Sequence, residues 1–212
     1  MENNQQHLEA LQDIRQMMKQ SNKFLSLSGL SGIFAGIYAL GGAYLGQVII
    51  SDFIDDINLN GFSIEEYRKT VFRCVFVCAA VLVMSLVTAL LFSGRKARKH
   101  GYKLFDHTTW RLMINMLIPL FTGGMFCIAM LYHDNNFVQL VGPAMLMFYG
   151  LALVNGSKYT LNDIRYLGCM EIVLGIIACF YLGYGLLFWA IGFGVLHIIY
   201  GAYMWFKYDR KY

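Results

Sequence analysis

Apolar blocks separated by short polar segments run along most of the chain. Each block is about twenty residues long, the helix length that crosses a hydrocarbon core of roughly 30 Å. Such blocks must be helical in lipid, because an isolated strand leaves its backbone polar groups without partners there. The pattern predicts an all-α, polytopic membrane helix bundle with six transmembrane helices. Their expected positions are residues 24–50, 71–93, 112–132, 137–155, 166–183 and 186–206.

The polar segments at the two ends of the chain differ in pattern. In the first segment, apolar residues recur at helical spacing, namely Leu8, Leu11, Ile14 and Met18. This spacing predicts a short amphipathic helix within residues 1–23 that lies on the cytoplasmic membrane surface, with a partly disordered tail as the alternative. Residues 207–212 form a short polar tail after the last span.

Basic residues predict the orientation, since they concentrate in cytoplasmic loops. With six spans, Arg68, Lys69 and Arg73 lie on one side, and the rest of the seventeen lysines and arginines lie on the other. With five or seven spans, each side of the membrane would contain both loops rich in basic residues and loops poor in them. We therefore expect both termini in the cytoplasm.

The composition favours the same class of protein. Hydrophobic residues make up 58% of the chain, charged residues make up 14%, and the mean hydropathy is +0.51. Soluble domains usually contain about 45–50% apolar residues. The five cysteines all fall in apolar blocks without metal-type spacing, so we expect them to act as small hydrophobes and expect no cofactor. No nucleic-acid partner is expected either, because the pattern includes no soluble domain.

Three segments carry a resemblance to known proteins: residues 26–36 (SLSGLSGIFAG), 148–159 (FYGLALVNGSKY) and 188–197 (FWAIGFGVLH). They are similar to a family of small, uncharacterised bacterial multi-pass inner-membrane proteins. The resemblance covers most of the chain and implies a location in the bacterial inner (plasma) membrane. It implies no activity, ligand or catalytic residue.

Polar side chains inside the expected spans are the first candidates for function, because charge is costly at membrane depth. Glu171 lies in the fifth span, and small residues share its helical face, namely Gly168, Gly175 and Ala178. Its carboxyl should therefore point toward a neighbouring helix. His197, Tyr200 and Asn115 complete the candidate polar site, and a hairpin of the last two spans would bring Glu171, His197 and Tyr200 together. Two interpretations stay open: a centre that relays protons or binds a cation, and interhelical hydrogen bonds that hold the bundle together.

Charged residues near the membrane surfaces indicate further candidates. A basic cluster follows the second span and is expected to contact anionic lipid headgroups; it contains Arg95, Lys96, Arg98, Lys99 and Lys103.

On the opposite side we expect an acidic outer loop at residues 52–70. Asp56, Asn58 and Asn60 match the first half of a calcium loop there, and Glu66, the candidate for the last ligand, falls one residue short of the required position. The stronger interpretation is that Ser63 and Glu66 form a capping box that starts the second span, and Thr160 with Asp163 resembles a cap for the fifth.

Several classes of function remain after these observations. The chain contains no phosphate-binding, nucleophile or dinucleotide motif, so we do not expect an enzyme; an intramembrane lipid-modifying enzyme is the least favoured alternative. The first hypothesis is a non-enzymatic membrane component that binds a partner or senses its surroundings. The alternative is a small oligomeric transporter or channel for a proton, ion or small solute that uses Glu171 and His197. Expected partners are the lipid bilayer and either further copies of this chain or another membrane protein.

Overall fold

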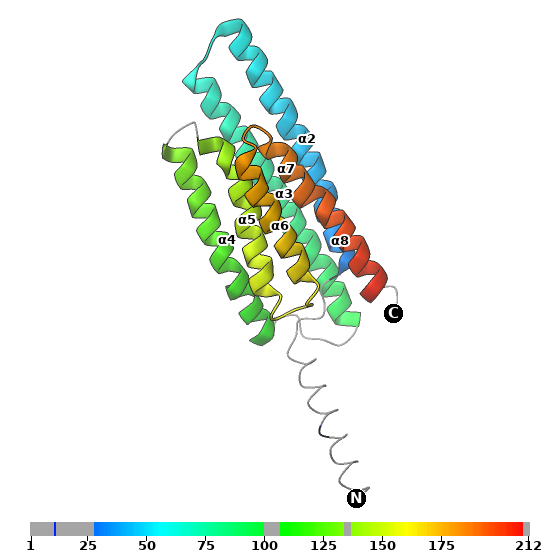
Figure 1. The fold of residues 1–212 in the computed structure, drawn as a ribbon. Coiled ribbons are helices and arrows are strands. Elements are labelled where there is room, and N and C mark those ends of the chain that lie inside the picture. The colour runs from blue at the N-terminus through cyan, green and yellow to red at the C-terminus, as the bar shows by residue number, and fades with distance from the viewer. Residues whose placement is uncertain (1–10, 12–27, 100–106, 134–136, 210–212) are drawn as a thin grey trace, which may run out of the picture.

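A computed structural model describes Leu11 and residues 28–99, 107–133 and 137–209, and regular structure in these ranges is helical throughout (Figure 1). Apart from Leu11, the amphipathic helix expected in residues 1–23 lies outside the described residues. The elements are α2 (Gly29–Asn60), α3 (Ile64–Lys99), α4 (His107–His133), α5 (Val138–Gly156), α6 (Ile164–Phe180), α7 (Gly185–Trp189), the π-helix η2 (Ala190–Leu196), α8 (His197–Met204) and the π-helix η3 (Trp205–Asp209). The last four elements follow one another without a break and form one rod.

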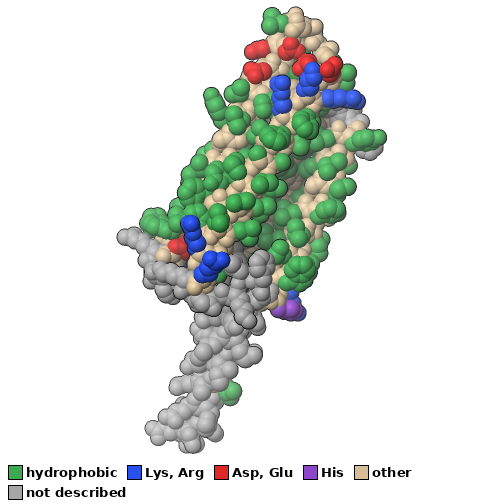
Figure 2. Space-filling view, turned by 180° about the vertical axis from the view of Figure 1, so that it is seen from behind, with side chains coloured by type: hydrophobic (Ala, Val, Ile, Leu, Met, Phe, Trp, Pro, Cys, Tyr) green, Lys and Arg blue, Asp and Glu red, His purple; other side chains and the backbone are tan. Residues whose placement is uncertain are grey.

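Five helical segments are long and apolar enough to cross a membrane: Gly29–Asn60, Ile64–Arg98, His107–Tyr132, Val138–Gly156 and Gly185–Asp209. They agree with five of the six predicted spans. The remaining helix, α6, has 17 residues and is therefore about 25 Å long, slightly less than the hydrocarbon core. The space-filling view fits this assignment, since hydrophobic side chains cover the middle of the molecule and charged ones gather toward both ends (Figure 2).

The α2–α3 hairpin differs from the sequence-based expectation. The expected outer loop at residues 52–70 is mostly helical, because α2 continues to Asn60 and α3 begins at Ile64. The turn between them uses Gly61, whose φ of 82° favours glycine and whose N–H donates to the Ile57 carbonyl. The helices have 32 and 36 residues, about 48 and 54 Å by helical rise, and the hairpin extends beyond the other helices (Figure 1).

Side-chain contacts at helical spacing explain why the acidic segment stays helical outside the apolar region. The Asn60 amide donates to the Asp56 carboxylate at 2.7 Å, one turn away. In the next helix, Lys69 pairs with Glu65 and Glu66 at 3.0 and 2.8 Å. The calcium alternative is not supported by this geometry, because Asp56, Asn58 and Asn60 lie in a regular helix rather than in a ligand-forming loop. The helix that contains the second span begins directly after Ser63, and the capping box of Ser63 and Glu66 stays a prediction.

Glycines permit the closest contacts between helices. A Cβ atom at Gly150 of α5 would lie 2.6 Å from the Gly168 carbonyl oxygen of α6, and a Cβ at Gly168 would lie 2.7 Å from the Gly150 carbonyl oxygen. Likewise, a Cβ at Gly201 of α8 would lie 2.6 Å from the Ile33 nitrogen of α2. These distances leave room for hydrogen only, so the α5–α6 and α2–α8 pairs depend on small residues. Outside them, α3 packs on α2 and α4 packs on α5.

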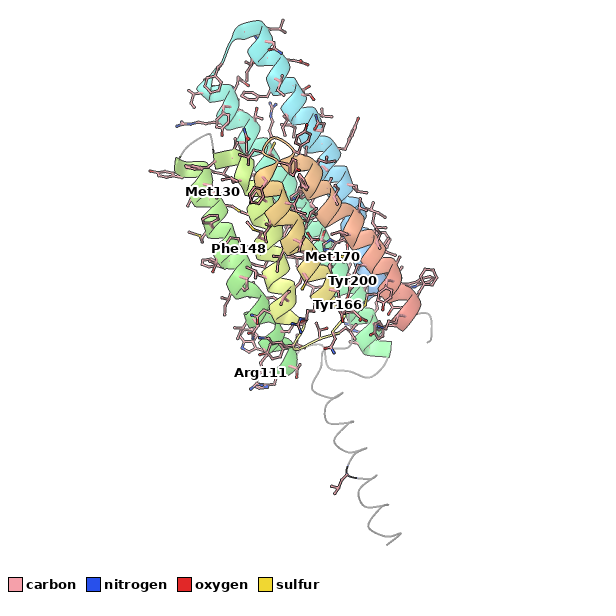
Figure 3. All side chains as sticks on the ribbon, viewed as in Figure 1. Arg111, Met130, Phe148, Tyr166, Met170 and Tyr200 are labelled. Carbon is pink, nitrogen blue, oxygen red and sulfur yellow. The ribbon has the colours of Figure 1, made fainter. Side chains whose placement is uncertain are left out.

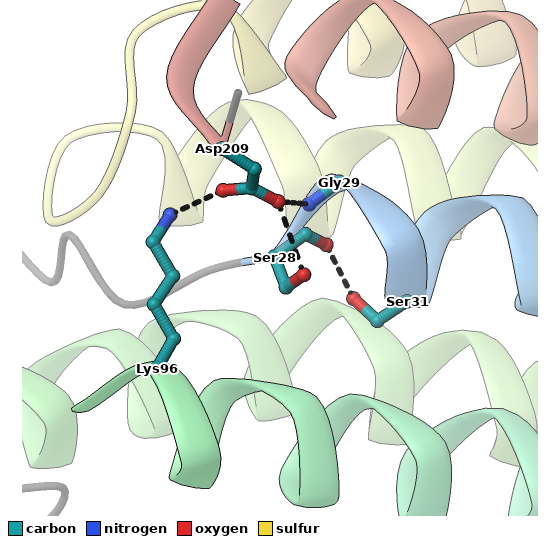
Figure 4. Close-up of polar contacts among 5 residues, drawn as sticks. All are labelled: Ser28, Gly29, Ser31, Lys96 and Asp209. Carbon is teal, nitrogen blue, oxygen red and sulfur yellow. Dashed lines mark hydrogen bonds and ion pairs between the residues drawn. The ribbon is translucent and has the colours of Figure 1, made fainter. Parts of the chain in front are cut away.

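One carboxylate joins three helices at the end of the bundle where α2 begins (Figure 4). Asp209, the last residue of η3, accepts hydrogen bonds from Lys96 at 2.7 Å, from the Gly29 N–H at 2.9 Å and from the Ser28 hydroxyl at 3.1 Å. It thereby caps the N-terminus of α2 from a distant part of the chain.

This contact corrects one predicted role in the basic cluster. The Lys96 side chain is only 20% exposed in its ion pair with Asp209, so it holds helices together, whereas we expected a contact to lipid headgroups. Arg95 and Arg98 are exposed as a headgroup contact requires. Lys99 ends α3, and Lys103 lies outside the described residues.

Candidate functional site

Glu171 is the one acidic residue that is buried among the described residues. The inward face of α6 consists of Ile164, Leu167, Gly168, Glu171, Gly175 and Ala178, as the spacing of small residues predicted. On the other side of the same helix, Tyr166 and Met170 are exposed (Figure 3). The Glu171 side chain is 0% exposed, and it lies about 10 Å from the start of the helix by helical rise.

His197 approaches this acid from the C-terminal rod, where it follows the π-helix η2 directly. Its Nδ1 lies 3.0 Å from the carbonyl oxygen of Gly192, five residues earlier. Since a carbonyl can only accept, Nδ1 carries a proton and donates it. On the opposite edge of the ring, Nε2 lies 2.7 Å from the Tyr149 hydroxyl of α5. In the neutral ring, Tyr149 donates to Nε2, so both ring nitrogens are satisfied.

The carboxyl group of Glu171 lies beside this histidine without a hydrogen bond of its own. Its Oε1 atom is 3.5 Å from His197 Nδ1, while the Nδ1 proton is directed at the Gly192 carbonyl. Neither Oε1 nor Oε2 has a hydrogen-bond partner among the described residues. An ionised carboxylate in this position would be buried and unneutralised, which is costly. The site therefore suits a carboxyl that holds a proton or receives a cation.

Gly192 allows the rod to come this close to α6. A Cβ atom at Gly192 would lie 2.5 Å from Glu171 Oε2 and would also clash with Leu146 Cδ2. The residue thus has two roles, since its carbonyl oxygen accepts from His197 and its missing side chain admits the carboxyl. Widened π turns are frequent at functional sites because they redirect side chains.

Two sequence-predicted members of the polar site lie elsewhere. The Tyr200 hydroxyl is buried without a hydrogen-bond partner in the described structure, and its ring packs against the apolar cluster of Leu153, Leu161, Ile164, Leu167 and Met204. Asn115 belongs to α4, where it donates to the Arg111 carbonyl and its own carbonyl accepts from Asn155 of α5 at 2.9 Å. The structure therefore brings together Glu171 and His197, and adds Tyr149 and Gly192 in place of Tyr200 and Asn115.

A second polar cluster lies at the surface, below the buried site. Asp163 precedes α6 but makes no cap hydrogen bond with its side chain, in contrast to the predicted role. Its carboxylate instead accepts from Lys207 at 2.7 Å and from the Tyr208 hydroxyl at 2.8 Å. Partial burial opposes ionisation, but the hydrogen bonds from Lys207 and Tyr208 outweigh it and lower the pKa of Asp163.

Replacing Asp163 with asparagine should destabilise the protein at neutral pH and have little effect in acid. A carboxyl whose pKa is lower in the folded state adds stability above its unfolded pKa of about 4 and loses it as the pH falls through the folded value. Melting temperatures of both proteins in detergent, measured from pH 7 to pH 3, should converge toward low pH. A constant difference across this range would contradict the assignment, and the matched variant D56N on the projecting hairpin should show a smaller difference at pH 7.

No family model, curated sequence or solved structure gave a significant match to this chain. The resemblance to small bacterial inner-membrane proteins thus stays a prediction. Among the described residues, no group of three or more histidine, cysteine, aspartate or glutamate side chains is arranged to hold a metal ion. The feature of the described residues that bears most directly on function is the geometry of Glu171, His197 and Tyr149.

Proposed function

We propose that this protein is a non-enzymatic component of a bacterial inner membrane that responds to protons at Glu171. One observation carries the proposal: the carboxyl is fully buried at mid-bundle, has no hydrogen-bond partner among the described residues, and lies 3.5 Å from a histidine nitrogen. A structural carboxyl would use its oxygens to join helices, as Asp209 does at the bundle end. Glu171 does not, so its place in the core favours reversible protonation over a structural role.

The response would begin as a local change of charge beside the π turn. Proton uptake and release at Glu171 would be felt by His197 of α8 and Tyr149 of α5, the titratable groups that face it. Since Gly192 of η2 contacts both the carboxyl and the imidazole, ionisation would act directly on the widened turn. The resulting movement of the rod would then alter binding of a partner chain or the oligomeric state of the protein.

The proposed topology has six spans with both termini in the cytoplasm. In its support, Asp209 at the end of the last span bonds to Ser28 and Gly29 at the start of the first. Proximity of these two ends favours an even number of crossings, and six crossings result if α6 crosses with the five longer segments. Most basic residues that the structure describes lie at the helix ends on that same side, which favours the cytoplasm; they are Arg95, Lys96, Arg98, Lys99, Arg111, Lys158, Arg165 and Lys207.

A second candidate is a small oligomeric transporter or channel for a proton, ion or small solute. It is favoured by the depth of the site, because Glu171 and His197 both lie near the middle of their helical segments. Transport would require that the centre open alternately to each side of the membrane. Proton uptake at Glu171 is common to both candidates, so it is tested first.

Infrared difference spectroscopy of the protein in proteoliposomes tests the proposal directly. Between alkaline and acidic pH, the wild type should gain a carboxylic C=O band that is absent from Glu171→Gln. The variant Glu66→Gln, which removes an exposed carboxylate of the hairpin, should keep the band. If Glu171→Gln leaves the band unchanged, or if no protonated carboxyl appears, Glu171 does not exchange protons and the proposal fails. A dye-detected proton flux lost in Glu171→Gln would favour the transporter.

A further inference from the structure

A pocket of about 310 Å³ lies between the start of α3 and the end of α4. It belongs to the end of the molecule opposite the Asp209 cluster, where the projecting hairpin meets the rest of the bundle (Figure 1). Tyr67 and Arg68 line its α3 side, and Tyr132 lines its α4 side. None of these residues takes part in the buried Glu171 site.

The α3 side of the lining begins with Ile64, continues with Tyr67 and Arg68, and is apolar below them. Below Arg68 the wall consists of Val71, Phe72 and Val75 on α3 and of Leu131 on α4. Val75 is seven positions after Arg68, which is about 10 Å along the helix. The pocket therefore combines one cationic group near its outer end with an apolar part below it, which we call the apolar channel.

Arg68 is the available cation at this end of the pocket. Its neighbour Lys69 pairs with Glu65 and Glu66, whereas no acidic group among the described residues pairs with Arg68. The guanidinium is exposed, and its planar fork suits the two oxygens of a phosphodiester. Tyrosines at the same level are typical of the interface between headgroups and hydrocarbon.

We propose that this pocket binds one phospholipid of the adjacent leaflet, with its phosphate on Arg68 and an acyl chain along Val71, Val75 and Leu131. The charge complementarity and the apolar channel below it select a molecule that has both an anionic head and a hydrocarbon tail. The lipid would fill the space between the first four turns of α3 and the end of α4. The inference rests on the membrane position proposed above but does not depend on protonation of Glu171.

Native mass spectrometry of the full-length protein, titrated with phosphatidylglycerol in detergent, tests the site. We expect one lipid to bind to the wild type, and Arg68→Gln to weaken that binding about fivefold, the effect of one basic residue near an anionic surface. The matched control is Arg73→Gln, since Arg73 is an exposed arginine of the same helix that does not line the pocket. It should bind as the wild type does.

Further experiments distinguish a lipid phosphate from free phosphate and test whether the acyl chain occupies the apolar channel. Val75→Trp should also weaken binding, because the larger side chain occupies the channel while Arg68 is intact. Equal losses in Arg68→Gln and Arg73→Gln would show general surface attraction and would overturn the proposal. Displacement of the lipid by excess inorganic phosphate would overturn it as well, by showing a free-anion site. Thermal melting followed by circular dichroism should give the same midpoint for Arg68→Gln and the wild type.

Discussion

Replacement of Gly168 by alanine should lower the apparent free energy of unfolding by about 2 kcal/mol, which is typical of overpacking at a closely packed contact. The new Cβ atom would lie 2.7 Å from the Gly150 carbonyl oxygen and 2.9 Å from the Val154 nitrogen. Both are backbone atoms, so no side-chain rotation relieves the clash, and α5 and α6 must separate. Denaturation in mixed micelles measures the effect.

Gly124→Ala provides the matched control for this prediction. Gly124 is an exposed glycine of α4, and a Cβ built on it meets nothing within 4 Å. The same chemical change should therefore be neutral or raise stability by up to about 1 kcal/mol through helix propensity. If both variants change stability equally, the close approach of α5 and α6 is not the cause. Separation of these helices would also displace Glu171, so Gly168→Ala should disturb the infrared band of the buried carboxyl.

The sequence predicts the transmembrane part of the fold well because lipid imposes strong requirements on composition. Each of the five long segments coincides with an apolar block, and the inward face of α6 follows from the spacing of Gly168, Glu171 and Gly175. The same reasoning fails for the α2–α3 hairpin. Outside the bilayer a polar segment can be loop or helix, and local pairs such as Asp56–Asn60 decide the outcome. Hydropathy does not report such pairs.

The candidate site was predictable only in part. Glu171 and His197 stand out because charged or ionisable groups are rare at membrane depth. Tyr149 does not stand out, because tyrosine is common near membrane interfaces. Nothing in the sequence indicates that its hydroxyl forms a hydrogen bond with His197. The sequence predicts Tyr200 as a partner of Glu171 if the last two spans form a regular hairpin. In the structure, Glu171 lies beside Gly192 and His197. The π turns of the rod and the helices that pack against it determine this placement, and the sequence pattern does not reveal either of them.

Replacing Glu171 with leucine should raise the apparent free energy of unfolding by about 1–3 kcal/mol, the usual cost of a buried polar group without a partner. Leucine is of comparable size and removes two oxygens that make no hydrogen bonds in the structure. The variant should also lose the pH-dependent carboxyl band. A gain of stability combined with a loss of response is the expected result for a residue kept for function.

His197→Leu gives the opposite expectation and completes the test. It would leave the Tyr149 hydroxyl and the Gly192 carbonyl without the ring that now joins them at 2.7 and 3.0 Å, so stability should fall by roughly 1–3 kcal/mol. Destabilisation by Glu171→Leu of the same size would mean that the carboxyl, like the imidazole, holds the bundle together. Opposite signs for two side chains 3.5 Å apart would separate the group that responds to protons from the group that positions it.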